Sequence, residues 1–116
     1  MPRTITRDEL QRRLATPSTP VLLEALPEKY YRDGHLPGAL YMPHDRVVAL
    51  APAVVPDKAA EIVVYCASET CRNSHIAARA LEDLGYANVS VYVGGKKDWA
   101  DAGLPVERDG AALAAV

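Results

Sequence analysis

The sequence predicts an open α/β domain with a mainly parallel sheet. Short apolar segments rich in valine and isoleucine alternate along the chain with segments of helical periodicity. This order is typical of folds in which helices connect neighbouring parallel strands. The chain has 116 residues, of which 49% are hydrophobic, so it can form one core and is too short for two ordinary domains. We expect one domain over residues 1–108 and a flexible tail at residues 109–116.

Composition disfavours several classes of function. The formal net charge is -2 at pH 7, so the chain has no basic excess with which to hold nucleic acid or an anionic membrane surface. No apolar run is long enough to span a bilayer. The first residues, Met1–Thr4, lack the apolar core of a secretory signal. We therefore expect a soluble, cytoplasmic protein without nucleic-acid or membrane partners.

The first element is a helix with clear boundaries. Thr6 and Glu9 form a capping-box pattern, in which the threonine caps the helix and the glutamate reaches back. Pro17 and Pro20 end this helix. Val21–Leu23 follows as a buried strand, because it is short, apolar and bounded by helix-breaking residues.

The next elements are short. Pro27–Asp33 is expected to be a helix, with Gly34 suited to the left-handed position at its end. Ala39–Met42 is a short strand. Asp45–Ala51 has weak helical character, and Pro52–Asp57 is expected to be a loop.

The second half of the chain has the stronger patterns. Ile62–Tyr65 is β-branched and apolar, as expected for a central parallel strand. A helix follows and ends at Gly85. The residues expected on its apolar face are Ile76, Ala77, Ala80, Leu81 and Leu84. Val89–Val93 alternates valine with other residues as a strand does, and Lys97–Asp101 is a short helix that carries Trp99.

Two cysteines follow the central strand. In open α/β sheets, ligands bind beyond the carboxyl ends of strands, where Cys66 lies, and its loop leads into a helix N-terminus. Unpaired N–H groups there can stabilise a thiolate, a persulfide or an oxyanion and lower a thiol pKa. Arg72 adds positive charge and Glu69 opposes it. The alternative is that Cys66 is a buried core residue and Cys71 a loop residue without chemistry.

Three motifs occur in order between residues 5 and 106. Gly34–Ala39 reads G-H-L-P-G-A, and Tyr65–Cys66 is followed by a loop and an alanine-rich helix. The third motif comprises Leu84-Gly85-Tyr86, Val91-Tyr92-Val93-Gly94-Gly95, Trp99 and Gly103-Leu104-Pro105. Together they resemble the rhodanese-like (sulfurtransferase) domain family, in a variant with an extended active-site loop. The resemblance implies a mainly parallel five-stranded sheet flanked by helices.

The resemblance also implies a function. Cys66 would be the catalytic residue, carrying a persulfide cradled by backbone N–H groups. Sulfane sulfur would pass from a small donor, such as thiosulfate or a persulfide, to a thiol or protein acceptor, with no metal or organic cofactor. The implied substrate-binding loop consists of Ala67, Ser68, Glu69, Thr70, Cys71 and Arg72.

The chain departs from the family pattern in two places. The common family strand ends in D-V-R, whose arginine can help to bind an anionic substrate, whereas the matching segment here is Glu24–Leu26. The common loop is C-x-x-G-x-R-S, with serine six residues after the cysteine. Here Ser74 comes eight residues after Cys66, and the longer loop lacks the glycine and contains a second cysteine, Cys71.

Several alternatives remain open for the cysteine loop. Cys66 and Arg72 also fit the C-x5-R loop of phosphatases and arsenate reductases, although Glu69 would repel an oxyanion. Cys71 could resolve a Cys66 persulfide or sulfenate by forming a disulfide. A metal site could join both cysteines to His75, but the loop offers no clear fourth ligand. A non-catalytic binding module is the last alternative.

The other histidines and a lysine pair have structural interpretations. His35 lies in the G-H-L-P-G-A turn, where we expect a hydrogen bond to nearby backbone. We expect His44 to face solvent. Lys96 and Lys97 are expected to be a surface charge pair, with contact to an anionic substrate as the alternative.

Overall fold

Five parallel strands form the centre of residues 2–108, which are the residues that this computed structural model describes. The strands are β1 (Arg3–Ile5), β2 (Val21–Glu24), β3 (Leu40–Tyr41), β4 (Ile62–Tyr65) and β5 (Val89–Tyr92). The helices are α1 (Arg7–Leu14), α2 (Glu28–Asp33), α3 (Val47–Val54), α4 (Asn73–Asp83) and α5 (Gly95–Asp101). The strand order is β1-β5-β4-β2-β3, and each neighbouring pair is parallel. The expected α/β class and five-stranded sheet are confirmed.

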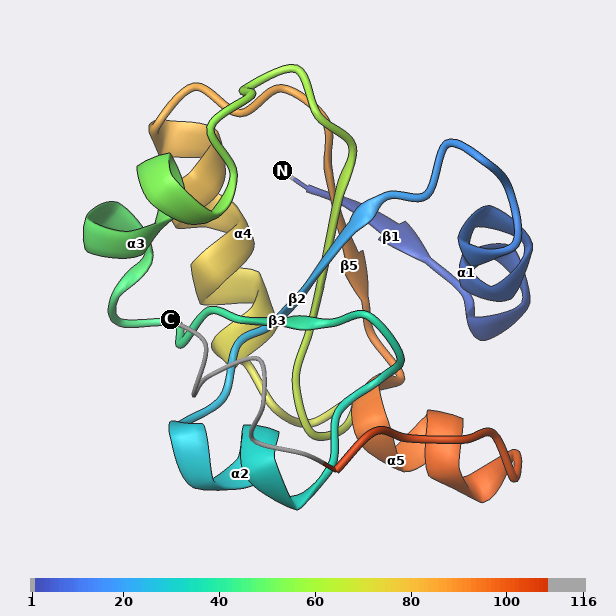
Figure 1. Cartoon of the computed structure of the whole chain (residues 1–116). Helices are drawn as coiled ribbons and strands as arrows, with labels where there is room; N and C mark the ends of the chain where they lie inside the picture. The colour runs from blue at the N-terminus through green and yellow to red at the C-terminus, as the bar shows by residue number, and fades with distance from the viewer. Residues whose placement is uncertain (1, 109–116) are drawn as a thin grey trace.

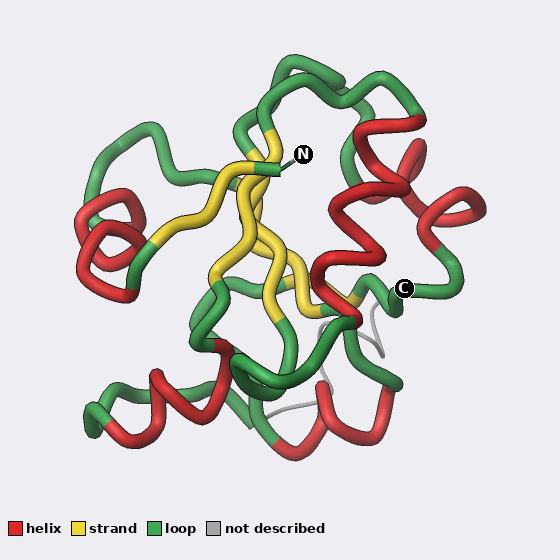
Figure 2. The backbone as a smooth tube through the Cα atoms, turned by 180° about the vertical axis from the view of Figure 1, so that it is seen from behind, coloured by secondary structure: helices red, strands yellow, loops and turns green. Residues whose placement is uncertain are grey.

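Helices cover both faces of the sheet. Figure 1 shows α3 and α4 on one side and α1 on the other, and Figure 2 shows the same separation from behind. Alternate strand residues face opposite layers: Leu23 and Val64 pack in a cluster with residues of α3 and α4, whereas Leu22 and Val63 pack with residues of α1 and α5. Because helices cover both faces of β2 and β4, a ligand can reach the sheet only at the ends of these strands.

The capping box predicted at the start of the first helix is confirmed. The Thr6 hydroxyl accepts a hydrogen bond from the Glu9 backbone N–H at 3.2 Å, and the Glu9 carboxylate accepts one from the Thr6 backbone N–H at 3.2 Å. This reciprocal pair satisfies N–H groups that a helix start leaves unpaired.

Two boundaries differ from the expectation. Strand β1 was not predicted, because Arg3–Ile5 is short and largely exposed; it forms an edge strand by pairing with β5. The expected loop at Pro52–Asp57 is wrong at its start, since α3 continues to Val54 with Pro52 inside it. Proline has no backbone N–H, so the Val48 carbonyl lacks its usual hydrogen bond within the helix. Pro52 is tolerated because both residues lie on the exposed side of α3.

Three expectations about single residues are corrected. Ile76 is 49% exposed, because α4 turns its small residues toward the sheet. Gly34 has a positive φ, of 158°, but with a ψ of 132° it is not left-handed helical, and the chain leads directly into a bridge between His35 and Glu107. His44 does not face solvent freely; it is half-buried, and its Nδ1 is buried without a hydrogen-bond partner within residues 2–108.

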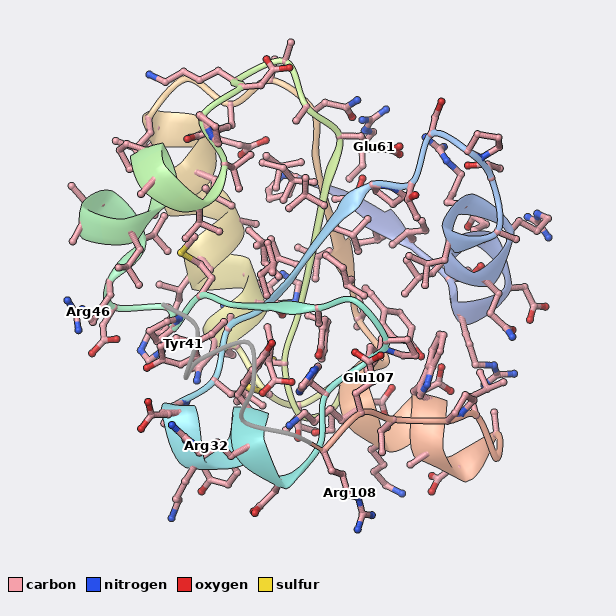
Figure 3. The ribbon with its side chains drawn as sticks, viewed as in Figure 1. Arg32, Tyr41, Arg46, Glu61, Glu107 and Arg108 are labelled. Atoms are coloured by element: carbon pink, nitrogen blue, oxygen red, sulfur yellow. The ribbon has the colours of Figure 1, made fainter. Side chains whose placement is uncertain are left out.

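The turn that contains His35 behaves as expected. His35 is buried, and its Nδ1 lies 3.0 Å from the Tyr31 carbonyl oxygen. The imidazole ring of His35 also stacks on the ring of Tyr31. Glu107, labelled in Figure 3, accepts a hydrogen bond from the Gly38 N–H at 3.0 Å. These contacts fasten the segment after α5 to the turn. The expected tail at residues 109–116 lies outside the described residues.

One further property concerns membranes. Within residues 2–108, the helices are all too short or too polar to cross a bilayer.

Candidate active site

Cys66 lies at the carboxyl end of the central strand β4, where the loop to α4 begins. Figure 3 marks the opposite, amino end of that strand with Glu61, which lies far from α2 and α5. The carboxyl ends of all five parallel strands meet at one edge of the sheet. The cysteine therefore occupies the position at which open α/β sheets bind ligands.

The Cys66 thiol is enclosed by the loop and by the start of α4. The residue is 1% exposed, and its Sγ lies 3.3 Å from the Cys71 carbonyl oxygen and 3.4 Å from the Ser74 Oγ. Ser74, in the first turn of α4, is itself buried. A thiol carries one proton and donates to one of these oxygens at a time.

The pKa of Cys66 does not follow the sequence expectation. Burial raises the pKa of this thiol, and its hydrogen bond with Cys71 acts in the same direction. The Ser74 hydroxyl and backbone N–H favour the thiolate but do not outweigh burial. The expected depression by the helix N-terminus is therefore wrong for the closed loop.

Cys71 is the more acidic of the two thiols. It is half-buried, and burial alone would raise its pKa. Hydrogen bonds from the Cys66 thiol and from the backbone N–H groups of Ala67 and Asn73 outweigh burial and lower the pKa. The loop therefore favours negative charge at the sulfur of Cys71, not at that of Cys66.

The start of α5 holds the cysteine loop in place. The Lys96 backbone N–H donates to the Cys66 carbonyl oxygen at 2.9 Å, and the Lys97 N–H donates to the Ala67 carbonyl oxygen at 2.9 Å. Gly95 makes this approach possible, because a Cβ there would lie 2.5 Å from the Cys66 carbonyl oxygen. Its φ of 66° is also left-handed. The second glycine of the Val91–Gly95 motif is the sequence signal for this contact.

A buried ionic network lies beneath the loop. Glu24 is fully buried, and one carboxylate oxygen accepts a hydrogen bond from the Tyr65 hydroxyl at 2.7 Å. Its other oxygen lies 3.0 Å from Lys96 Nζ. Burial raises the pKa of Glu24, although Tyr65 and Lys96 both oppose the rise. Lys96 is thus engaged by an anion and is not the surface charge that we expected.

The residues of the expected substrate-binding loop differ in exposure. Ser68 and Cys71 are half-buried, whereas Ala67, Glu69, Thr70 and Arg72 are exposed. The Ser68 and Thr70 hydroxyls lie 3.0 Å apart. Within the described chain, Arg72 makes no ion pair and no side-chain hydrogen bond, with Glu69 or any other group. The cation required by an oxyanion loop is therefore not turned into the site.

Two adjoining cavities of about 410 and 190 Å³ border the loop through Glu69. They share Gly94 and Asp98 and extend from the start of α1 to the exposed side of α5. The charged residues that line them are Arg7, Asp8, Glu69, Lys97, Asp98 and Asp101. Both cations are paired, Arg7 with Asp98 and Lys97 with Asp101, each at 2.8 Å. Within residues 2–108, Asp8 and Glu69 make no such pair, so the groove formed by the two cavities is acidic.

The metal-site alternative finds no support in residues 2–108. No three side chains of histidine, cysteine, aspartate or glutamate gather there in a way that could hold an ion. Cys66, Cys71 and His75 therefore do not form a ligand set.

The geometry and the motifs can now be compared with known proteins. A family model described as a rhodanese-like domain matches residues 6–102. The chain belongs to the rhodanese-like domain family. This confirms the resemblance drawn from the three motifs, and the sheet of this rhodanese-like domain is the one that the resemblance implied.

Individual relatives agree with this assignment. An HTH-type transcriptional regulator of Mycobacterium tuberculosis is 33% identical over 103 residues, which cover 89% of this chain and 44% of the regulator. The structure of thiosulfate sulfurtransferase from Pseudomonas aeruginosa superposes with a TM-score of 0.82 and 28% identity, over 92% of this chain and 20% of that one. A rhodanese from E. coli, solved with anions, gives a TM-score of 0.64 and 30% identity, over 76% and 96% of the two chains. This rhodanese-like domain thus spans less than half the length of the first two.

Proposed function

We propose that this rhodanese-like domain is a sulfurtransferase that carries sulfane sulfur as a persulfide on Cys66. The observation that carries the proposal is the position of Cys66, at the carboxyl end of β4 and at the start of a loop that leads into α4. Membership of the family supports it, as does the likeness to a solved thiosulfate sulfurtransferase.

The proposed reaction has two displacement steps. In the first, the Cys66 thiolate attacks the outer sulfur of a donor R–S–SH, which forms Cys66–S–SH and releases R–S⁻. With thiosulfate the leaving group would be sulfite. In the second step, an acceptor thiolate attacks the sulfane sulfur and becomes a persulfide, and Cys66 leaves as a thiolate. Neither step requires a cofactor or a net oxidant.

The surroundings of Cys66 suit a stored persulfide better than an open nucleophile. The residue is nearly inaccessible, and the hydrogen bonds from α5 hold the loop over it. Enclosure protects a reactive intermediate from stray solutes. Loading then requires the loop between Ala67 and Arg72 to move, after which the Ser74 hydroxyl and N–H remain beside the thiolate.

Charge around the loop favours a donor with little negative charge. Leu26 stands where the common family segment has an arginine and is buried. Lys96 is already paired with Glu24, and Glu69 adds negative charge to the loop. We infer that a small persulfide or polysulfide is a better donor than the thiosulfate dianion, and that the acceptor is a thiol, free or on a protein.

Sulfur uptake and release test the proposal directly. The full chain and its Cys66→Ser variant would be treated with polysulfide, glutathione persulfide and thiosulfate, alkylated, and analysed by intact mass and peptide mapping. We expect one added sulfur on Cys66 of the unmodified chain, its transfer to an added thiol, and no such adduct at position 66 in the variant. Absence of sulfur uptake from every donor, or turnover of a phosphate ester or of arsenate instead, would overturn the proposal.

A further inference from the structure

The second cysteine of the loop is arranged around the first. Cys66 Sγ lies 3.3 Å from the Cys71 carbonyl oxygen, and each thiol shifts the pKa of the other. The backbone between them is not helical, and the Cys71 N–H closes a turn on the Ser68 carbonyl oxygen at 3.1 Å. A turn of this kind brings together two residues that a helix would separate.

The Cys71 thiol is half-buried and has a lowered pKa. The backbone N–H groups of Ala67 and Asn73, at the two ends of the loop, hydrogen-bond to it. N–H groups that converge from such a loop form a nest for an anion. The sulfane sulfur of a Cys66 persulfide would need donors of the same kind. In the free protein, these N–H groups already favour a thiolate at the second sulfur.

We propose that Cys71 is a resolving thiol, which attacks the Cys66 persulfide and releases its sulfane sulfur as hydrosulfide. This inference rests on the proposed function, because it needs the Cys66 persulfide as its starting point. The chain contains two cysteines in all, so no other thiol of the same chain can take this part. Its lowered pKa gives Cys71 a larger thiolate fraction than an ordinary thiol at neutral pH.

The step balances without an outside oxidant. The Cys71 thiolate attacks the Cys66 sulfur, which lies 3.3 Å from the Cys71 carbonyl oxygen in the free protein, and HS⁻ leaves. The products are the Cys66–Cys71 disulfide and hydrosulfide: two thiol sulfurs are oxidised, and the sulfane sulfur is reduced. Two equivalents of an external thiol then reduce the disulfide and return both cysteines to the thiol form.

This step would alter what the domain does when acceptors are scarce. An external thiol attacks the outer sulfur and carries it away as a persulfide. Cys71 attacks the inner sulfur and discharges it as hydrosulfide. The second thiol thus limits the lifetime of the persulfide, and the protein becomes a persulfide reductase that depends on thiols for its recovery.

The test compares persulfide lifetimes in matched variants. The full chain would be studied beside Cys71→Ser and Cys71→Ala, which both lack the sulfur but differ in polarity; circular dichroism would establish that each is folded. After a short pulse of polysulfide, samples would be alkylated at intervals and analysed by intact mass and peptide mapping. Hydrosulfide would be measured with a bimane reagent.

The outcomes separate the two proposals. We expect the unmodified chain to form a Cys66–Cys71 disulfide with one hydrosulfide released for each, while both variants keep the Cys66 persulfide at least about tenfold longer. Equal persulfide lifetimes without a disulfide, or sulfane sulfur retained on Cys71, would overturn this inference and leave the sulfurtransferase proposal standing. Failure of all three proteins to form a Cys66 persulfide would overturn both.

Discussion

Substitution of Gly95 by alanine tests whether α5 holds the cysteine loop. The added Cβ would lie 2.5 Å from the Cys66 carbonyl oxygen and 2.9 Å from both the Ala67 carbonyl carbon and the Ser68 nitrogen. An ordinary contact begins near 3.4 Å, so the loop or the start of α5 would have to shift by about 0.9 Å, the difference between the two distances. All three contacted atoms belong to backbone and cannot move aside separately.

The expected loss of stability has two parts. An alanine in the left-handed region costs about 1–2 kcal/mol, and a steric shift in a packed region costs about 1–3 kcal/mol more. Gly103→Ala is the matched control, because Gly103 also has a positive φ, of 76°, but a Cβ there would have no neighbour within 4 Å. The difference between the two variants, about 1–3 kcal/mol, isolates the contact with the loop.

Equilibrium unfolding in urea, followed by circular dichroism, gives this difference. For a domain of this size, it corresponds to a melting temperature roughly 5–20 °C lower for Gly95→Ala than for Gly103→Ala. The displaced loop should also expose Cys66, so its alkylation should become faster in Gly95→Ala alone. If the two variants have equal stability and equal alkylation rates, the reasoning that α5 anchors the loop is refuted.

Three further predictions concern charge near the site. Burial raises the pKa of Cys66, whereas hydrogen bonds lower the pKa of half-buried Cys71. Iodoacetamide should therefore label Cys71 first at pH 7. Peptide mapping that finds Cys66 labelled first would contradict this prediction. Glu69→Gln should increase the rate of sulfur uptake from thiosulfate about twofold to fivefold, the effect of one screened surface charge, and should leave uptake from a neutral trisulfide unchanged; equal effects on both donors would count against it. Burial raises the pKa of Glu24 in the folded state above its ordinary 4.5, so its stabilising contribution is complete below pH 4.5 and is lost as the pH rises through the folded pKa. Glu24→Gln, which resembles the protonated acid, should therefore gain stability relative to the unmodified chain between pH 4 and 8 in urea titrations, and a constant difference would argue against it.

The parts of the fold that could be predicted are those that local pattern determines. Ile62–Tyr65 is a run of apolar residues, and the Thr6 capping box fixes the start of α1 from residues three apart. Strand β1 could not be predicted, because Arg3–Ile5 is short and mostly polar and becomes a strand only by pairing with β5. Likewise, nothing near Pro52 in the sequence shows that it lies on the solvent side of α3.

The electrostatics of the site depend on contacts between distant segments. The position of Cys66 at a strand end could be predicted, but its raised pKa could not, because burial comes from the packing of loop and α5. Lys96 and Glu24 carry no local signal for one another and meet only when β2 and α5 lie at the same edge of the sheet. Sequence patterns identify which groups are available, whereas the fold determines which of them face each other.

Two residues that follow Cys66 lie close to its sulfur, although the spacing of the loop departs from the family pattern. Ser74 comes eight residues after Cys66 instead of six, and its Oγ lies 3.4 Å from the Cys66 sulfur. The helix that carries Ser74 thus begins beside the thiol at the end of the longer loop. Cys71 lies within this extension, and its carbonyl oxygen is 3.3 Å from the Cys66 sulfur. An extension that merely widened the loop for a larger anion would leave its interior open and direct Arg72 inward. This one contains a second, half-buried thiol and leaves Arg72 exposed, an arrangement that favours sulfur exchange between two cysteines over oxyanion chemistry.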